Sequence, residues 1–115
     1  MSSNCIFCKI VKGEIPATKV FENQNILAFR DIKAASPEHI LVIPKVHKAN
    51  LNEMTEEDQT LLGELLLTVK NIAKDLGVTE QGYRTVINTG DNGGQTVHHL
   101  HLHLLAGRRH TWPPG

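Results

Sequence analysis

The chain of 115 residues carries 12 Lys and Arg against 12 Asp and Glu, so its formal net charge is zero, and 40% of its residues are hydrophobic. This composition is typical of a single globular domain over residues 1–115, and it argues against a disordered chain or a charge-driven grip on nucleic acid. No apolar run approaches the roughly 20 residues of a membrane-spanning helix, and the first residues lack the pattern of a secretory signal. We therefore expect a cytoplasmic protein that binds neither membrane nor nucleic acid.

The first half of the chain predicts a short helix followed by three strands. Asn4 is a suitable N-cap for the helix, and Gly13 is suited to end it. Three polar residues at 23–25 indicate a hairpin between the first two strands, and Pro44 stops the third. The predicted strands lie at residues 19–22, 26–30 and 39–43.

The second half predicts one long helix and two further strands. Apolar residues recur at spacings of three and four from Thr55 to Leu76, and Gly77 suits the position after the helix. Strands are predicted at 83–88 and 98–105, with a Gly-rich polar loop at 89–96 between them. Most connections are too short for crossovers, so we expect an α+β fold: a five-stranded antiparallel sheet with one long helix and a short N-terminal helix.

Four of the seven histidines lie within residues 98–103, at the start of the last predicted strand. Because side chains alternate between the faces of a strand, one face carries His99, His101 and His103 about 7 Å apart, together with Leu105. We expect the opposite face to join the core. That face carries His98, Leu100, Leu102 and Leu104.

The row of imidazoles has two chemical interpretations. It predicts either a metal site or an imidazole nucleophile with imidazole helpers around a phosphate. The preceding loop contains the adjacent glycines Gly93 and Gly94, where backbone N–H groups can approach an anion closely. This loop favours phosphate chemistry.

The segment 93–105 resembles the signature of the histidine triad family, His-φ-His-φ-His-φ-φ, in which φ is apolar. The resemblance covers nearly the whole chain and is to the Hint branch, which contains purine nucleoside phosphoramidases. It implies the fold of that family. The other matching segments are residues 6–10, 14–16, 28–32, 39–45 and 112–115.

The resemblance implies that the central histidine, His101, is a nucleophile. It would attack the α-phosphorus of a purine nucleoside 5′-phosphoramidate, such as AMP-lysine, or of an acyl-adenylate. Water would then release the nucleoside monophosphate from a covalent nucleotidyl-histidine, and no cofactor is needed for this chemistry. The alternatives are a dinucleoside polyphosphate hydrolase, a nucleotidyltransferase, or a non-catalytic regulatory module that binds nucleotide or zinc.

The resemblance also implies roles for other residues. His103 would contact phosphate oxygens, while His99 and His39 would form a supporting hydrogen-bond network. Asp31 would accept hydrogen bonds from both ribose hydroxyls. The apolar walls of the base pocket would be Ile6, Phe7, Ile10, Phe29, Ile32 and Leu41. The residues around the phosphate or leaving group would be Asn88, Gly94, Gln95 and Thr96.

The two cysteines form a Cys5-x-x-Cys8 motif with its thiols one helical turn apart. From spacing alone the pair can be metal ligands, redox groups or buried apolar residues. Some histidine triad relatives, including galactose-1-phosphate uridylyltransferase, bind zinc through a similar motif and two histidines. The matching histidines here are His47 and His99, so the resemblance implies a structural zinc site.

The long predicted helix carries more leucine than one core-facing stripe needs. Leu61, Leu62, Leu65 and Leu66 lie close together, and Leu61 is at the edge of the stripe. Either all of these leucines pack within the chain, or some of them contact a second copy of it. The strand at 83–88 is also a candidate for pairing with the same strand of a second copy. The resemblance implies a two-fold homodimer in which the tail around Trp112 approaches the partner's active site.

Overall fold

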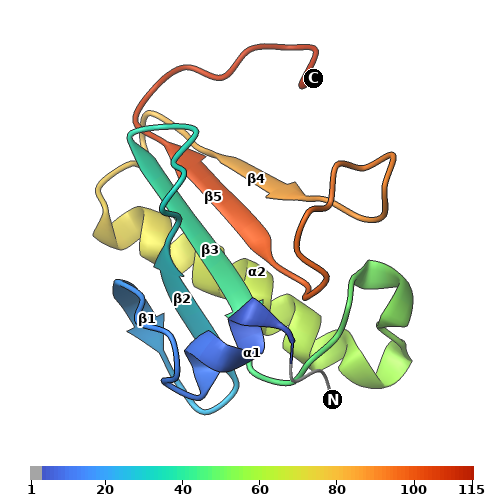
Figure 1. Ribbon diagram of the computed structural model, residues 1–115. Helices are drawn as coiled ribbons and strands as arrows, with labels where there is room; N and C mark the ends of the chain where they lie inside the picture. The colour runs from blue at the N-terminus through green and yellow to red at the C-terminus, as the bar shows by residue number, and fades with distance from the viewer. Residues whose placement is uncertain (1–3) are drawn as a thin grey trace.

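The computed structural model describes residues 4–115 as an antiparallel sheet in the order β1-β2-β3-β5-β4 (Figure 1). The predicted fold class is confirmed, with β3 and β5 inside the sheet and β1 and β4 at its edges. Two single-turn 3-10 helices, Leu51–Glu53 and Glu56–Asp58, precede the long helix. The helices and strands are α1 (Ile6–Val11), β1 (Lys19–Glu22), β2 (Ile26–Arg30), β3 (Glu38–Pro44), α2 (Gln59–Asp75), β4 (Arg84–Ile87) and β5 (Leu102–Ala106).

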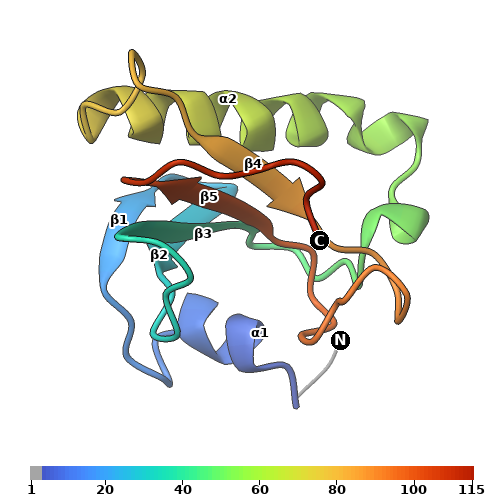
Figure 2. The ribbon, with the colours of Figure 1, turned by 90° about the horizontal axis from the view of Figure 1, so that it is seen from above.

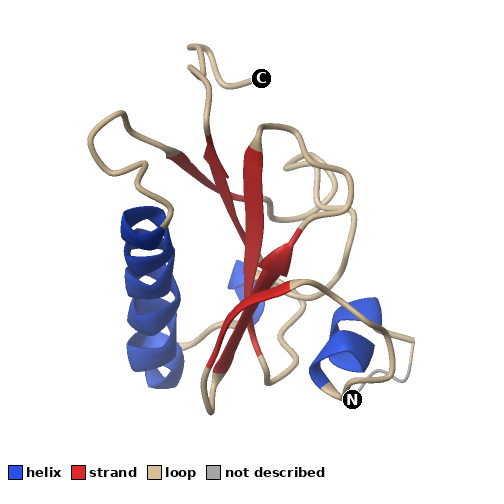
Figure 3. Ribbon diagram, turned by 90° about the vertical axis from the view of Figure 1, so that its left-hand side faces the viewer, coloured by secondary structure: helices blue, strands red, loops and turns tan. Residues whose placement is uncertain are grey.

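The sheet is covered on both faces, by α2 on one side and by α1 on the other (Figures 2 and 3). Alternate residues of β2 and β3 therefore enter two separate cores, because neighbouring side chains of a strand point to opposite faces. The core under α2 includes Ile26, Ile40, Val42, Leu65, Val69, Ile72, Leu100, Leu102 and Leu104. The core under α1 includes Phe7, Ile10, Leu27, Phe29, Leu41 and Ile43.

The ends of the helices depend on local hydrogen bonds. Thr55 forms a capping box with Asp58 at the start of the 3-10 turn that leads into α2, and Gly77 follows the helix with φ of 75°. The prediction that Asn4 caps α1 was wrong. Cys5 is the N-cap, because its backbone is extended and its Sγ accepts a 3.3 Å hydrogen bond from the N–H of Cys8.

The face of α2 that is turned from the sheet exposes Leu66 and Leu67, which are 47% and 58% accessible. Leu61, predicted to lie at the edge of the apolar stripe, packs together with Leu62 against the protein's own core. Over residues 4–115, no helix is both long enough and apolar enough to cross a bilayer.

The last strand begins at Leu102, four residues later than predicted. Val42 of β3 pairs with Leu102, and before that point the chain leaves the ladder: the N–H of Leu100 donates to the carbonyl of Lys48 at 2.6 Å. His98 is exposed, so its predicted place on the core face was wrong. The three leucines predicted on the same face do join the core, since Leu100, Leu102 and Leu104 are all buried under α2.

Candidate functional site

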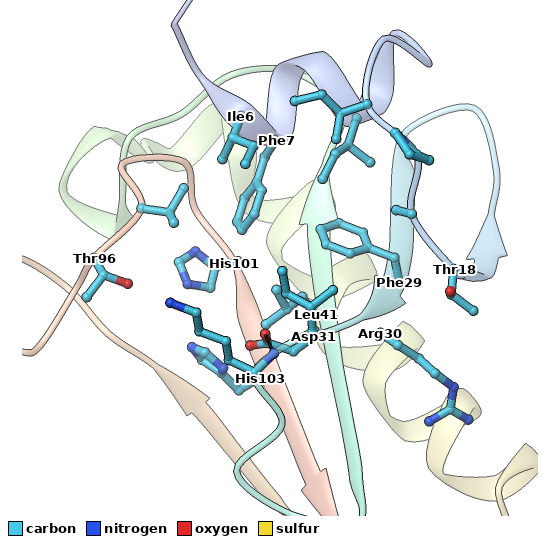
Figure 4. Close-up of a pocket in the computed structure, with 17 residues that line it drawn as sticks. Ile6, Phe7, Thr18, Phe29, Arg30, Asp31, Leu41, Thr96, His101 and His103 are labelled. Carbon is cyan, nitrogen blue, oxygen red and sulfur yellow. Dashed lines mark hydrogen bonds between the residues drawn. The ribbon is translucent and has the colours of Figure 1, made fainter.

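A cavity of about 690 Å³ opens on the α1 side of the sheet, between α1, the loop after β2 and the chain leading into β5 (Figure 4). Its walls are mostly apolar, and this volume is in the range of ordinary small-molecule sites. All six apolar residues predicted from the family resemblance line it. They are Ile6, Phe7, Ile10, Phe29, Ile32 and Leu41.

Four predicted polar residues also line the cavity: Asp31, Thr96, His101 and His103. Figure 4 shows the imidazoles of His101 and His103 next to each other, with Phe7 above His101. The two rings lie with their centroids 4.9 Å apart. The structure therefore brings the second and third histidines of the triad together on one wall.

Of the residues predicted around the phosphate or leaving group, three lie outside this lining: Asn88, Gly94 and Gln95. The side-chain amide of Asn88 donates to the carbonyl of Gly93 at 2.7 Å, and Gly94 follows with φ of 79°. Gln95 is buried, and its amide binds backbone groups on both sides of the loop. Its partners are Ala49 O at 2.7 Å, Val97 O at 3.0 Å and Gly90 N at 2.9 Å.

The tautomer of His101 follows from its hydrogen bond. Nδ1 lies 2.7 Å from the carbonyl oxygen of His99, and because a carbonyl can only accept, Nδ1 carries the proton. Nε2 is therefore left with a lone pair. Burial lowers the pKa of His101, which keeps this ring neutral at pH 7, and the ring of Phe7 meets it at 90° with centroids 5.2 Å apart.

His39 and His103 form a second chain of hydrogen bonds. The N–H of Ala35 donates to Nδ1 of His39 at 2.9 Å, so His39 carries its proton on Nε2. That Nε2 lies 2.9 Å from Nδ1 of His103, which must accept, and His103 then carries its own proton on Nε2. Asp31 Oδ2, at 3.5 Å from His39 Nε2, is a weaker second acceptor.

Both rings of this chain are neutral at pH 7. Burial lowers the pKa of His39. The pKa of His103 falls to about 4, because the ring is desolvated and lies beside the imidazoles of His101 and His39. The site thus presents one unprotonated nitrogen, on His101, next to one N–H donor, on His103.

The first histidine of the triad, His99, faces away from the cavity toward the two cysteines. Its Nε2 donates to the carbonyl of Pro44 at 2.9 Å, so Nδ1 carries the lone pair. This Nδ1 lies 3.3 Å from Cys5 Sγ, 3.6 Å from Cys8 Sγ and 3.2 Å from His47 Nδ1. Cys8 Sγ lies 3.3 Å from His47 Nδ1, and all four ligand atoms are within 4.8 Å of one another.

These four residues fit a zinc ion. A tetrahedron with ordinary Zn–S and Zn–N bonds has N···N edges of about 3.3 Å and S···N edges of about 3.5 Å, close to the separations found here. Both cysteines are free thiols, and His99 has its lone pair on the nitrogen that faces them. Burial raises the pKa of the Cys8 thiol, an effect that a bound cation would oppose.

A second group of potential ligands, Asp31, His39 and His103, fits a cation poorly. Nδ1 of His39 already accepts from Ala35, so the Nε2 that faces the group must keep its proton as long as the ring is neutral. The group is better described as the hydrogen-bond chain given above.

The HIT domain family matches residues 12–110 of the chain. The chain belongs to the HIT family. An uncharacterised HIT-like protein of Synechococcus elongatus is 63% identical over the full length of both chains, and a 14 kDa zinc-binding protein of Zea mays is 50% identical over 98% of this chain and 89% of its own. The crystal structure of a HIT family hydrolase from Legionella pneumophila superposes with a TM-score of 0.96 at 55% identity, covering 97% of this chain and 100% of that one.

Several groups of this HIT site have no signature in the sequence. The carbonyls of Pro44 and His99 and the N–H of Ala35 set the histidine tautomers, yet backbone groups belong to every residue type. Some side chains next to predicted positions were not predicted to line the cavity, although their closeness in sequence to Asp31, to Thr96 and to the 14–16 turn was a usable signal. These further lining residues are Ile15, Pro16, Ala17, Thr18, Lys33 and Val97. Arg30 also lines the cavity.

Proposed function

We propose that this HIT protein is a phosphoramidase of the Hint type, which hydrolyses the P–N bond of purine nucleoside 5′-phosphoramidates such as AMP-lysine. The observation that carries the proposal is the unprotonated Nε2 of His101 beside a cavity of about 690 Å³ with apolar walls. A neutral imidazole is a competent nucleophile near pH 7. The description of the Legionella pneumophila relative as a hydrolase supports the same class of reaction.

In the first step, the Nε2 lone pair of His101 forms a bond to the α-phosphorus, and the P–N bond to the leaving amine breaks. The amine departs with that electron pair and takes a proton from water. In the second step, a water oxygen bonds to phosphorus, the bond to Nε2 breaks, and the water gives up its proton to solvent. The products are the nucleoside monophosphate and the restored His101.

His103 would stabilise the negative charge that develops on the phosphate oxygens. Its proton is on Nε2 because Nδ1 accepts from His39, and an N–H donor fixed before the reaction needs no reorganisation during it. His39 acts as a positioning residue that holds this tautomer. His99 positions the nucleophile through its carbonyl oxygen.

The rest of the cavity would hold the nucleoside. The apolar walls suit a purine base, and Asp31 suits the ribose hydroxyls as an acceptor. Thr96 lines the cavity on the phosphate side. Asn88, Gly94 and Gln95 would serve the phosphate by shaping the loop that carries Thr96.

We also propose that Cys5, Cys8, His47 and His99 hold a structural zinc ion. Their donor geometry and the zinc-binding Zea mays relative support this assignment. Bound zinc would tie α1 to the chain after β3, and the chemistry at phosphorus remains with His101.

We propose further that the chain is one domain and forms a homodimer. The sheet edge at β4 offers a strand for pairing with its copy, and the exposed Leu66 and Leu67 offer apolar surface on α2. Trp112, which is exposed on the tail, would approach the partner's cavity.

The test is a substrate panel of AMP-amide, AMP-lysine and diadenosine polyphosphates, compared by kcat/KM. We expect the two phosphoramidates to be the best substrates and AMP to be the nucleotide product. Faster cleavage of the polyphosphates would replace the proposal with a polyphosphate hydrolase. Absence of turnover of any compound by folded protein would reject an enzymatic role.

A further inference from the structure

The short helix α1 and its N-cap carry residues of two different sites. Cys5 and Cys8 belong to the cysteine–histidine cluster, whereas Ile6, Phe7 and Ile10 line the cavity. Figure 4 shows Ile6 and Phe7 on the cavity side of this helix. The two sets alternate within residues 5–10, so a shift of α1 that alters one site also alters the other.

The position of α1 depends on its side chains. A helix of one or two turns is not stable on its own, and backbone N–H groups at its end donate to carbonyls of the same segment. These donors are Lys9, Lys12, Gly13 and Glu14, with acceptors within residues 5–10. The two thiols reach other segments: Cys5 Sγ lies 3.3 Å from His99 Nδ1. Cys8 Sγ lies 3.3 Å from His47 Nδ1. A metal ion shared by the cluster would therefore fix α1 against the segments of both histidines.

Phe7 lies between the two sites. It precedes Cys8 in the chain, and its ring meets the ring of His99 at 69° with centroids 5.9 Å apart. The same ring meets His101 at 90° with centroids 5.2 Å apart. Both are edge-to-face contacts, which depend on the relative placement of the rings. Phe7 thus contacts one residue of the metal cluster and the proposed nucleophile of the cavity.

His99 is shared by the two sites in a second way. Its ring belongs to the cluster, and its carbonyl oxygen accepts the 2.7 Å hydrogen bond from Nδ1 of His101. The next residue, Leu100, donates to the carbonyl of Lys48, which follows His47 in the chain. The segments that hold the cluster together are therefore the segments that place His101 on the wall of the cavity.

We propose that metal binding at the cysteine–histidine cluster and nucleotide binding in the cavity are cooperative, and that Phe7 is the positioning residue through which each site affects the other. This inference rests on the proposed zinc site and on the proposed placement of the nucleotide, but not on cleavage. Each ligand orders α1 and so lowers the ordering cost that the other ligand must meet. Because coupling is reciprocal, zinc and AMP raise each other's affinity by the same factor.

The experiment measures this coupling factor in both directions. Titration calorimetry gives the Kd of AMP for zinc-loaded protein and for protein stripped with a chelator. Competition with a chromophoric chelator gives the Kd of zinc with and without saturating AMP. The proteins are the natural chain and the variants Phe7→Leu and Phe29→Leu, each checked by circular dichroism. Phe7→Met, which fills more of the original volume, takes the place of Phe7→Leu if that variant does not fold.

The variant Phe29→Leu is the matched control. Phe29 lines the same cavity, belongs to the same core as Phe7 and packs against its ring with centroids 5.5 Å apart. It lies on β2, and this strand carries none of the four residues of the cluster. Both variants lose an aromatic ring from the cavity, but Phe7→Leu also loses the ring contacts with His99 and His101.

We expect the natural chain to bind AMP about fivefold more tightly when zinc is bound, and zinc about fivefold more tightly when AMP is bound, which is at the low end of measured couplings. Both variants should bind AMP more weakly than the natural chain. The coupling factor should persist in Phe29→Leu and fall close to one in Phe7→Leu.

A factor of one in the natural chain, with both ligands bound, would overturn the coupling and leave both sites standing. Equal factors in the two variants would show that the coupling runs through the general stability of the core, and would overturn the role of Phe7. Failure of zinc-loaded protein to bind AMP would overturn the proposed nucleotide site and the coupling together. Failure of the natural chain to bind zinc would do the same for the metal site.

Discussion

Replacing His47 with asparagine removes one ligand of the proposed zinc site and leaves the lining of the cavity intact. We expect the natural protein to contain about one zinc per chain, because four ligands close a structural site. At free zinc a thousandfold above Kd, binding adds about 4 kcal/mol to the free energy of unfolding. For a chain of 115 residues, each kcal/mol corresponds to about 4 °C in Tm, so losing zinc should lower Tm by about 15 °C.

The assay is elemental analysis of protein purified without chelator, followed by thermal unfolding with and without added zinc. The matched control is His98→Asn, because His98 is an exposed neighbour of His99 outside the ligand cluster. The control should keep both its zinc and its Tm. A natural protein without zinc, or a His47→Asn variant that binds as much zinc as the control, would refute the four-ligand site.

The nucleophile, a buried imidazole and the C-terminal tail each support a further prediction. The variant His101→Ala should lose several powers of ten in kcat while keeping its circular dichroism spectrum, and near-normal turnover would exclude a nucleophilic role. Lowering the pH from 6.5 toward 4 should reduce the free energy of unfolding, because the unfolded chain takes up a proton that folded His103, with its pKa of about 4, does not. Denaturant titrations should show a smaller loss in His103→Asn, and equal losses would contradict this. Sedimentation should give twice the chain mass of 12.8 kDa. Deleting residues 111–115 should change the preference for the leaving group more than it changes Tm. A fully active monomer at micromolar concentration would contradict both expectations.

The fold was predictable where a periodic pattern met a clear stop signal. The helix from Thr55 to Leu76 and the strand ending at Pro44 were visible from apolar spacing and from capping or breaking residues. The start of β5 was not. Residues 98–101 continue the alternating pattern of a strand, but hydrogen bonds to Lys48 and Pro44 hold them outside the ladder, and such long-range bonds leave no local trace in a sequence.

In the candidate site, too, some features could be predicted from the sequence and others depend on contacts between distant parts of the chain. Residue types that line the cavity, such as Asp31 and Thr96, could be assigned by resemblance because their side chains face it directly. The resemblance gives Gln95 a place around the phosphate or leaving group, but it does not show what the side chain contacts in the folded chain. Its amide has the right chemistry for a phosphate, yet backbone groups of Ala49, Gly90 and Val97 already occupy it.

The strand β3 connects the two ends of the histidine network within one short segment. His39, near its start, contacts His103, while the carbonyl of Pro44, at its end, holds the ring of His99. Five residue steps of extended chain separate these two positions by about 17 Å. Inserting or deleting one residue between them would either turn the side chain of His39 to the opposite face of the sheet or reverse the direction of the carbonyl that holds His99 within the sheet. We therefore expect changes in chain length to be tolerated in connections such as the turn at 78–82, whereas the length of β3 is dictated by the contacts at both its ends.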